Sequence, residues 1–106
     1  DMLIIRGVNV FPSQIETVLL NQGYSPNYQI IVDRKNNTDT LDINVELLPE
    51  QFSDKMSETQ EMEKSLEDAM RAMLGIKPKI HLVAPKTVTR SEGKAVRVID
   101  NRKLHD

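Results

Sequence analysis

The segment LDINVEL, residues 41–47, constrains the fold of this sequence most, because apolar and polar residues alternate through it without a break. A strand with this period-two pattern turns one side to a hydrophobic core and the other to water. The apolar side needs a cover from another layer of the molecule. Segments before and after it in the chain have the apolar periodicity of helices that could cover this side of the strand.

Two segments have the periodicity of helices that pack on a sheet. Residues 57–74 place apolar side chains at three- and four-residue intervals, opposite an acidic face. The apolar face consists of Met62, Leu66, Ala69, Met70 and Met73. Residues 13–22 open with Ser13 and Glu16 at the spacing of a capping box, and Gly23 follows as a stop signal. The methionine-rich face is also compatible with a binding groove, but the strand faces that need a cover favour core packing.

Further apolar runs at residues 2–5, 28–34 and 79–83 are typical of strands. A loop over residues 84–93 then leads to a last short strand over residues 94–99. The order β-α-β-β-α-β predicts an α+β fold. We expect a ferredoxin-like sandwich with two helices on one face of a small, mostly antiparallel sheet.

Composition indicates one soluble globular domain. The chain has 106 residues, 39% hydrophobic and 28% charged, with a net charge of −2. Its apolar runs are too short to span a bilayer, so no membrane partner is predicted. It contains no cysteine, which excludes disulfides and thiolate metal sites and agrees with a reducing cytoplasm. The histidines stand apart from clustered carboxylates, so no metal site is predicted.

Acidic residues are concentrated in residues 46–68 and basic residues in residues 71–103. The basic segment either faces solvent or approaches a phosphate group. Nucleic acid is not the predicted partner, because aromatic residues are few, none is interleaved with basic ones, and no RNP-type sequence occurs.

The sequence opens with DMLIIRG, a strand-like run without a start methionine. Because natural proteins seldom begin inside a strand, we expect the chain to be a piece of a longer protein. Two glycine-marked turns are its candidate sites, one at residues 7–9 and one at residues 89–94, TRSEGK. Glycine allows a ligand to approach the backbone closely, and a lysine after it can point an ammonium group at an anion. Each turn alone is also compatible with a plain turn or a solvated basic loop.

The phrases RGVNVFPSQIE and RSEGKAVRV, in this order, resemble the C-terminal domain of adenylate-forming acyl-CoA ligases, most of all the phenylacetate–CoA ligase branch. The resemblance spans nearly the whole chain. It makes residues 1–106 a single C-terminal lid domain, inactive alone, of a ligase whose large N-terminal adenylation domain lies in cis. It implies ATP, Mg²⁺, coenzyme A and an aryl carboxylic acid as substrates, with AMP as a product and no tightly bound cofactor.

The resemblance also assigns roles to residues in the two poses of such a lid. In the first pose Lys94 is the catalytic residue of acyl-adenylate formation, where its ammonium group offsets the repulsion between the carboxylate and the α-phosphate. The loop around it includes Arg90 and Ser91, which contact phosphate or hold the loop, and Gly93, which lets the loop enter the cleft.

In the second pose the resemblance places the first turn along the tunnel for the pantetheine arm of coenzyme A. The residues concerned are Gly7, Val8, Asn9 and Val10. The hinge between the poses lies at or next to Asp1. The alternative is a free-standing regulatory module that binds a small ligand on a ferredoxin-like sheet. Such a module needs no Lys94 and usually dimerises through a sheet edge.

Overall fold

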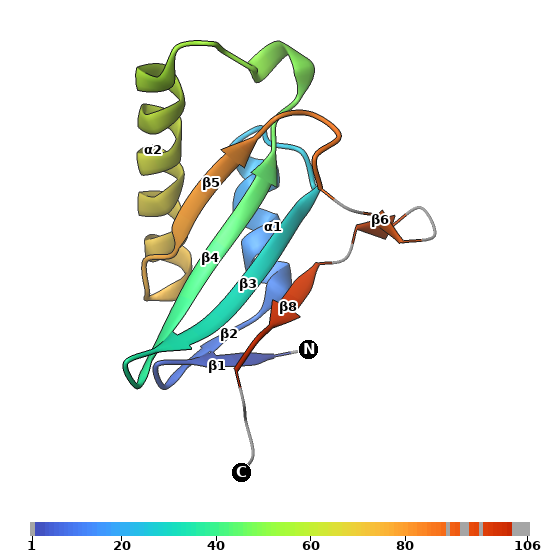
Figure 1. Ribbon diagram of the computed structural model, residues 1–106. Helices are drawn as coiled ribbons and strands as arrows, with labels where there is room; N and C mark the ends of the chain where they lie inside the picture. Colours follow the sequence, from blue (N-terminus) through green and yellow to red (C-terminus); the bar gives the residue numbers. More distant parts are fainter. Residues whose placement is uncertain (1, 89, 92–93, 96, 103–106) are drawn as a thin grey trace.

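The computed structural model of the chain describes residues 2–88, 90–91, 94–95 and 97–102. At its centre is a four-stranded sheet in the order β5-β4-β3-β8 (Figure 1). These strands are β3 (Tyr28–Lys35), β4 (Thr38–Glu46), β5 (Lys79–Val83) and β8 (Val98–Asp100). β3 and β4 form an antiparallel hairpin, whereas β5 runs parallel to β4 and β8 runs parallel to β3.

The alternation in β3 and β4 separates a buried side of the sheet from a partly exposed one. The buried side consists of Tyr28, Ile30, Val32, Leu41, Ile43 and Val45. Ile30 lies opposite Ile43 in the register, and Ile80 of β5 continues this row on the next strand. The predicted inward positions of Leu41, Ile43 and Val45 are therefore confirmed. β4 begins at Thr38, three residues before the predicted start, and Glu46, predicted to face water, is buried.

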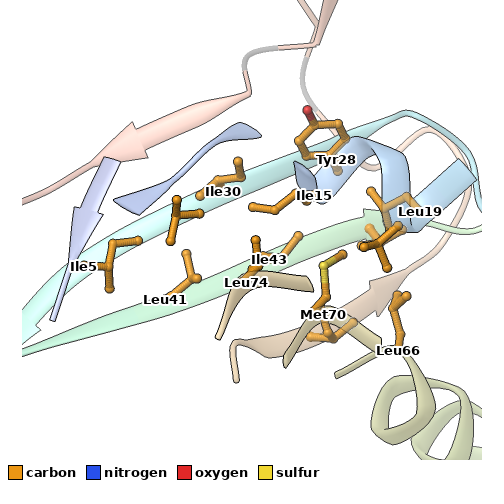
Figure 2. Packing of buried hydrophobic residues seen from close by; sticks show 14 of the residues in the cluster. Ile5, Ile15, Leu19, Tyr28, Ile30, Leu41, Ile43, Leu66, Met70 and Leu74 are labelled. Carbon is orange, nitrogen blue, oxygen red and sulfur yellow. The ribbon is translucent and has the colours of Figure 1, made fainter. Parts of the chain in front are cut away.

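Helices α1 (Pro12–Asn21) and α2 (Met56–Leu74) cover the buried side (Figure 1). Figure 2 shows their side chains meeting those of β3 and β4 in one core. The helical part of this core consists of Ile15, Val18, Leu19, Leu66, Met70 and Leu74. The expected position of Met73 in the core is wrong, because its side chain is 42% exposed. The α+β class and the two helices on a small sheet are confirmed.

The start of α1 differs from the predicted capping box of Ser13 and Glu16. The helix begins at Pro12, and the Phe11 N–H donates a hydrogen bond to Oε1 of Gln14 at 3.0 Å. Proline suits this position because its missing N–H has no partner to lose there. The Glu16 carboxylate is consequently available for contacts outside α1.

The chain begins with a separate antiparallel hairpin of β1 (Leu3–Ile5) and β2 (Val8–Val10). Arg6 and Gly7 connect the strands with φ values of 50° and 78°. Positive φ at both positions is typical of a type I′ turn, which matches the twist of the flanking strands. The prediction of a turn over residues 7–9 is therefore wrong: it starts one residue late and ends two residues late, because Val8 and Asn9 already belong to β2. The first strand pairs within this hairpin, and β8 lies beside β3 in the four-stranded sheet.

A second small hairpin, β6 (Arg90–Ser91) with β7 (Lys94–Ala95), precedes β8. Ser91 lies opposite Lys94 in its register. The predicted loop over residues 84–93 and the single strand over residues 94–99 are wrong here, because two short strands and β8 take their place. A short 3₁₀ helix, η1 (Pro49–Gln51), lies between β4 and α2.

Candidate functional site

The residues predicted for function lie on two hairpins that are well separated in the fold. β1 and β2 carry the Gly7 turn, and β6 and β7 carry Lys94. The two hairpins lie at opposite ends of β8 (Figure 1). Asp1 and Gly93, predicted as hinge and loop residues, lie outside the described residues.

The Gly7 turn presents backbone to solvent. Its Asn9 neighbour is exposed, Val8 is half-buried, and the Val10 side chain is fully buried in the core. A Cβ added at Gly7 would meet nothing within 4 Å. Glycine is therefore required by the positive φ of 78° and not by crowding within this chain. The space beside Gly7 is open to a ligand or to another domain.

The Asp39 carboxylate holds the Gly7 turn through a hydrogen bond to its backbone. Asp39, which is 8% exposed, accepts a hydrogen bond from the Arg6 N–H at 3.1 Å. The same carboxylate accepts from Nε of Arg34 at 3.0 Å and from Nη1 of Arg102 at 3.0 Å. These contacts, the Arg6 N–H first among them, hold the pKa of Asp39 below its ordinary value.

Arg102 connects this carboxylate to β1 and to the end of β8. Its side chain is 5% exposed, and Nη1 donates to the Ile4 carbonyl at 2.7 Å. Its Nε and Nη2 reach the two oxygens of Asp100 at 3.0 and 2.9 Å, the fork-to-fork geometry of a bidentate pair. The pKa of Asp100 is lowered chiefly by this side-chain hydrogen bond. We call Asp39, Asp100 and Arg102 the Asp39 cluster.

A depression of about 670 Å³ lies beside the Asp39 cluster. Strand β1, the turn between β3 and β4, and Arg102 form its walls. The charged side chains of Arg6 and Arg34 border it, as do Asp39 and Asp100. Positive and negative groups are thus both present at its rim, and Gly7 is part of the lining.

A second carboxylate lies at the foot of the Lys94 hairpin. Oε1 of Glu16 accepts a hydrogen bond from Nη1 of Arg97 at 2.5 Å and one from the Tyr28 hydroxyl at 3.2 Å. The Arg97 guanidinium stacks over the Tyr28 ring, 4.9 Å from its centroid. Burial raises the pKa of the Tyr28 hydroxyl. We call Glu16, Tyr28 and Arg97 the Glu16 cluster.

The other foot of this hairpin is also held by a carboxylate. Oε2 of Glu46, a residue only 5% exposed, accepts from the Val88 N–H at 3.1 Å. On the β8 side, the Arg97 carbonyl accepts from the Ile30 N–H at 2.6 Å. Both segments that flank the hairpin are thus fixed to the four-stranded sheet.

These two clusters were not predicted from the sequence. Arg97 and Glu16 are 81 positions apart, and Arg102 and Asp39 are 63 apart. Glu16 and Arg97 do occur inside the phrases RGVNVFPSQIE and RSEGKAVRV, and this was the only sequence signal that pointed to them. Among the described residues, no group of three or more His, Asp or Glu side chains could hold a metal ion. Within the same residues, no helix is long and apolar enough to cross a membrane.

The model of the AMP-binding enzyme C-terminal domain family matches residues 7–102, which include the Lys94 hairpin and, from the first hairpin, Gly7 and β2. The chain belongs to this family. Phenylacetate-coenzyme A ligase from Escherichia coli (strain K12) is 39% identical over 105 residues, covering 98% of this chain and 24% of that protein. The chain thus spans about a quarter of the length of the curated relatives it matches.

Solved structures of this domain family have the same fold. A domain of phenylacetate-coenzyme A ligase from Bacteroides vulgatus ATCC 8482 matches with a TM-score of 0.87 and 31% identity, covering 99% of this chain and 96% of that one. 2-Hydroxyisobutyryl-CoA ligase with 2-HIB-AMP and CoA, in the thioesterification state, matches with a TM-score of 0.85 and 32% identity, covering 97% and 22%. In its postadenylation state that ligase matches with a TM-score of 0.79, at 32% identity, covering 96% and 22%.

Proposed function

We propose that this chain is the lid of an AMP-forming CoA ligase that activates phenylacetate or a similar aryl acid. The observation that carries the proposal is the 39% identity to a phenylacetate-coenzyme A ligase over almost all of this chain. An adenylation domain in cis would hold the acid and most of the nucleotide. ATP with Mg²⁺ and coenzyme A would be the substrates of the complete enzyme.

The two hairpins give the lid two working surfaces. 2-Hydroxyisobutyryl-CoA ligase has solved structures in a postadenylation state and in a thioesterification state. By analogy, we propose that this lid presents the Lys94 hairpin to the active site for adenylation and the Gly7 hairpin for thioester formation. Because the hairpins lie at opposite ends of β8, a rotation of the lid exchanges one for the other.

In adenylation, the carboxylate of the acid attacks the α-phosphorus of ATP, and pyrophosphate leaves. Nucleophile and phosphate are both anions, so a cation between them lowers the barrier. The Lys94 ammonium is the proposed cation, and a positioned electrostatic group of this kind contributes about 3–4 kcal/mol to transition-state stabilisation. Arg90 and Ser91 lie on the paired strand and are the proposed phosphate contacts.

In thioester formation, the thiol of coenzyme A attacks the acyl carbon, and AMP leaves. The pantetheine arm is narrow and carries amides, so its passage requires small side chains and available backbone polar groups. The Gly7 turn is exposed and has open space beside it. We propose that Gly7, Val8 and Asn9 line this passage, with Val10 contributing only its backbone because its side chain is buried.

Pyrophosphate release tests the proposal. The complete enzyme, with phenylacetate and ATP, is expected to release pyrophosphate about 10²- to 10³-fold faster than its Lys94→Ala variant. Lys86→Ala is the control, since Lys86 is an exposed lysine outside the hairpin. Release at a similar rate by wild type and Lys94→Ala would contradict the catalytic role and favour the regulatory-module alternative.

A further inference from the structure

The two functional hairpins are short and stand outside the four-stranded sheet. β6 and β7 have two residues each, and β1 and β2 have three each. An isolated two-stranded hairpin is marginally stable at best in water. Contacts with the rest of the domain must therefore fix where each hairpin points.

Apolar contacts hold the strands of the β1–β2 hairpin, and polar contacts hold its turn. Ile5 and Val10 are fully buried in the core and hold its strands. The Arg6–Gly7 turn projects from these anchors, and its Arg6 N–H donates to Asp39. Asp39 is itself oriented by Arg102, which also donates to the Ile4 carbonyl on β1. The direction of the turn thus depends on one buried carboxylate.

The Lys94 hairpin depends on a different carboxylate. Arg97 follows β7 after one intervening position, and its guanidinium is held by Glu16 of α1 and by the Tyr28 ring. Glu16 belongs to neither hairpin and forms its contacts with β3 and with the segment just before β8. It therefore fixes the segment from which the Lys94 hairpin projects.

β8 connects the two clusters. It starts directly after Arg97 and ends at Asp100, which holds Arg102 in a bidentate pair. Its pairing with β3 fixes the strand between the two. The Glu16 cluster is thus fixed at the start of β8 and the Asp39 cluster at its end, each beside a different hairpin.

We propose that Glu16 and Asp39 are positioning residues for different half-reactions. Glu16, through Arg97, positions the Lys94 hairpin for adenylation; Asp39, with Arg102, positions the Gly7 turn for thioester formation. This inference rests on the proposed function of the two hairpins. It adds that each half-reaction has its own ion-paired cluster, so that one can be impaired without the other.

Geometry favours positioning over simple stabilisation. Ion pairs as exposed as Arg97 and Glu16, each 38% exposed, contribute little to stability. A buried pair such as Asp39 with Arg102 can often be replaced as a whole by apolar side chains at no loss of stability, although removal of one partner alone is destabilising. What both pairs provide is direction, because each guanidinium is also fixed by a second partner. The Arg97 guanidinium stacks over the Tyr28 ring, and Asp100 holds Arg102 in a bidentate pair. A displacement of about 1 Å at a reacting group can cost on the order of 10²-fold in rate.

The test measures both half-reactions of the complete ligase in Glu16→Gln and Asp39→Asn. Adenylation is followed by pyrophosphate release, and thioester formation by conversion of supplied phenylacetyl-adenylate with varied coenzyme A. Glu16→Gln is expected to slow adenylation about 10- to 100-fold and to leave thioester formation within about twofold. Asp39→Asn is expected to do the reverse, with a raised KM for coenzyme A.

Asp68→Asn is the matched control, because Asp68 is exposed and forms a surface ion pair at 3.2 Å with Lys77, a residue of neither hairpin. It should leave both half-reactions unchanged. Arg97→Lys retains the cation and is expected to recover part of the adenylation rate that Arg97→Met loses. A general loss of folded protein would lower both half-reactions together, whereas positioning predicts a loss in one half-reaction only. Equal losses of both half-reactions in Glu16→Gln or in Asp39→Asn therefore overturn the proposal. Unchanged rates of both half-reactions in these variants overturn it as well.

Amide hydrogen exchange of this 106-residue chain tests the positioning without catalysis. Glu16→Gln should speed exchange in residues 90–91 and 94–95 but not in residues 3–10, and Asp39→Asn should do the opposite. If Lys94→Ala leaves adenylation intact while exchange follows this pattern, the proposed function fails and the positioning stands. Unchanged exchange in both variants overturns the positioning itself.

Discussion

Arg102 and Asp39 form a buried ion pair at 3.0 Å between the end of the described chain and the first residues of β4, with side chains 5% and 8% exposed. The pair lies under the Gly7 turn, since Asp39 also accepts the Arg6 N–H. A contact that serves the fold and the turn at once has consequences for stability as well as for catalysis.

Acidification should expose the contribution of Asp39 to stability. The folded-state pKa of Asp39 lies below its unfolded value, so its contribution is fully present above the unfolded pKa and is lost as pH falls through the folded pKa. We expect the free energy of unfolding to be flat near neutrality and to decline below about pH 5, where carboxyl groups begin to protonate.

Asp39→Asn removes this titration, and the measurement compares chemical denaturation of both proteins at several pH values. The variant should lose less stability than wild type between neutral and acidic pH. Asp100, whose pKa is also lowered, leaves the variant some acid dependence. Identical pH profiles for wild type and Asp39→Asn would contradict a role for this carboxylate in acid stability.

Replacing Gly7 should separate backbone strain from tunnel lining. Its φ of 78° disfavours a side chain with a Cβ, so Gly7→Ala should destabilise the domain by about 1 kcal/mol. Asparagine tolerates positive φ better than alanine, so Gly7→Asn should be the more stable variant. Thermal unfolding of the two variants gives the comparison.

Gly7→Asn nevertheless adds the larger side chain to the proposed passage for coenzyme A. Thioester formation should therefore be slower in Gly7→Asn than in Gly7→Ala, the opposite order from stability. Rates that follow stability in both variants would argue against a tunnel role for this turn.

Two methionines of α2 provide a matched pair for the core. Met70 is fully buried and Met73 is 42% exposed, although both belong to the apolar stripe read from the sequence. Met70→Ala should lower the free energy of unfolding by about 2–5 kcal/mol through lost burial and a cavity. Met73→Ala should change it by less than about 0.5 kcal/mol. Urea denaturation of both variants gives the comparison. Equal losses of unfolding free energy would contradict the assignment of Met70 to the core and Met73 to the surface.

The inward residues of β4 could be predicted because period-two burial leaves a direct trace in the residue pattern, but the start at Thr38 and the burial of Glu46 could not. The apolar face of α2 was predicted less accurately. Each residue turns about 100° around the helix axis, and this rotation places Leu74 in the core and Met73 toward solvent. The hairpin of β1 and β2 was missed in part because β2 has only three residues, too few for a periodic signal. Arg6 at a positive φ is also not a residue that turn preferences would select.

The candidate residues of the two hairpins could be recognised from two sequence phrases. The Asp39 and Glu16 clusters that hold the hairpins could not be predicted. Asp39 lies in a stretch that reads as a simple turn, and its partners come from both ends of the chain. Arg97 could be seen beside Lys94 in the sequence, but its pairing with Glu16 arises only when β3 brings α1 and β8 together. Pairings over such separations depend on topology, which a single sequence does not specify.

If each hairpin of the lid serves one half-reaction, the loss of one hairpin's function leaves the other step intact. The most direct test is single-turnover conversion of supplied phenylacetyl-adenylate to phenylacetyl-CoA by the complete Lys94→Ala enzyme. We expect a rate close to that of wild type, because the proposed role of Lys94 is confined to adenylation. A loss in this step as large as the loss in pyrophosphate release would contradict the division of the two hairpins between the two half-reactions.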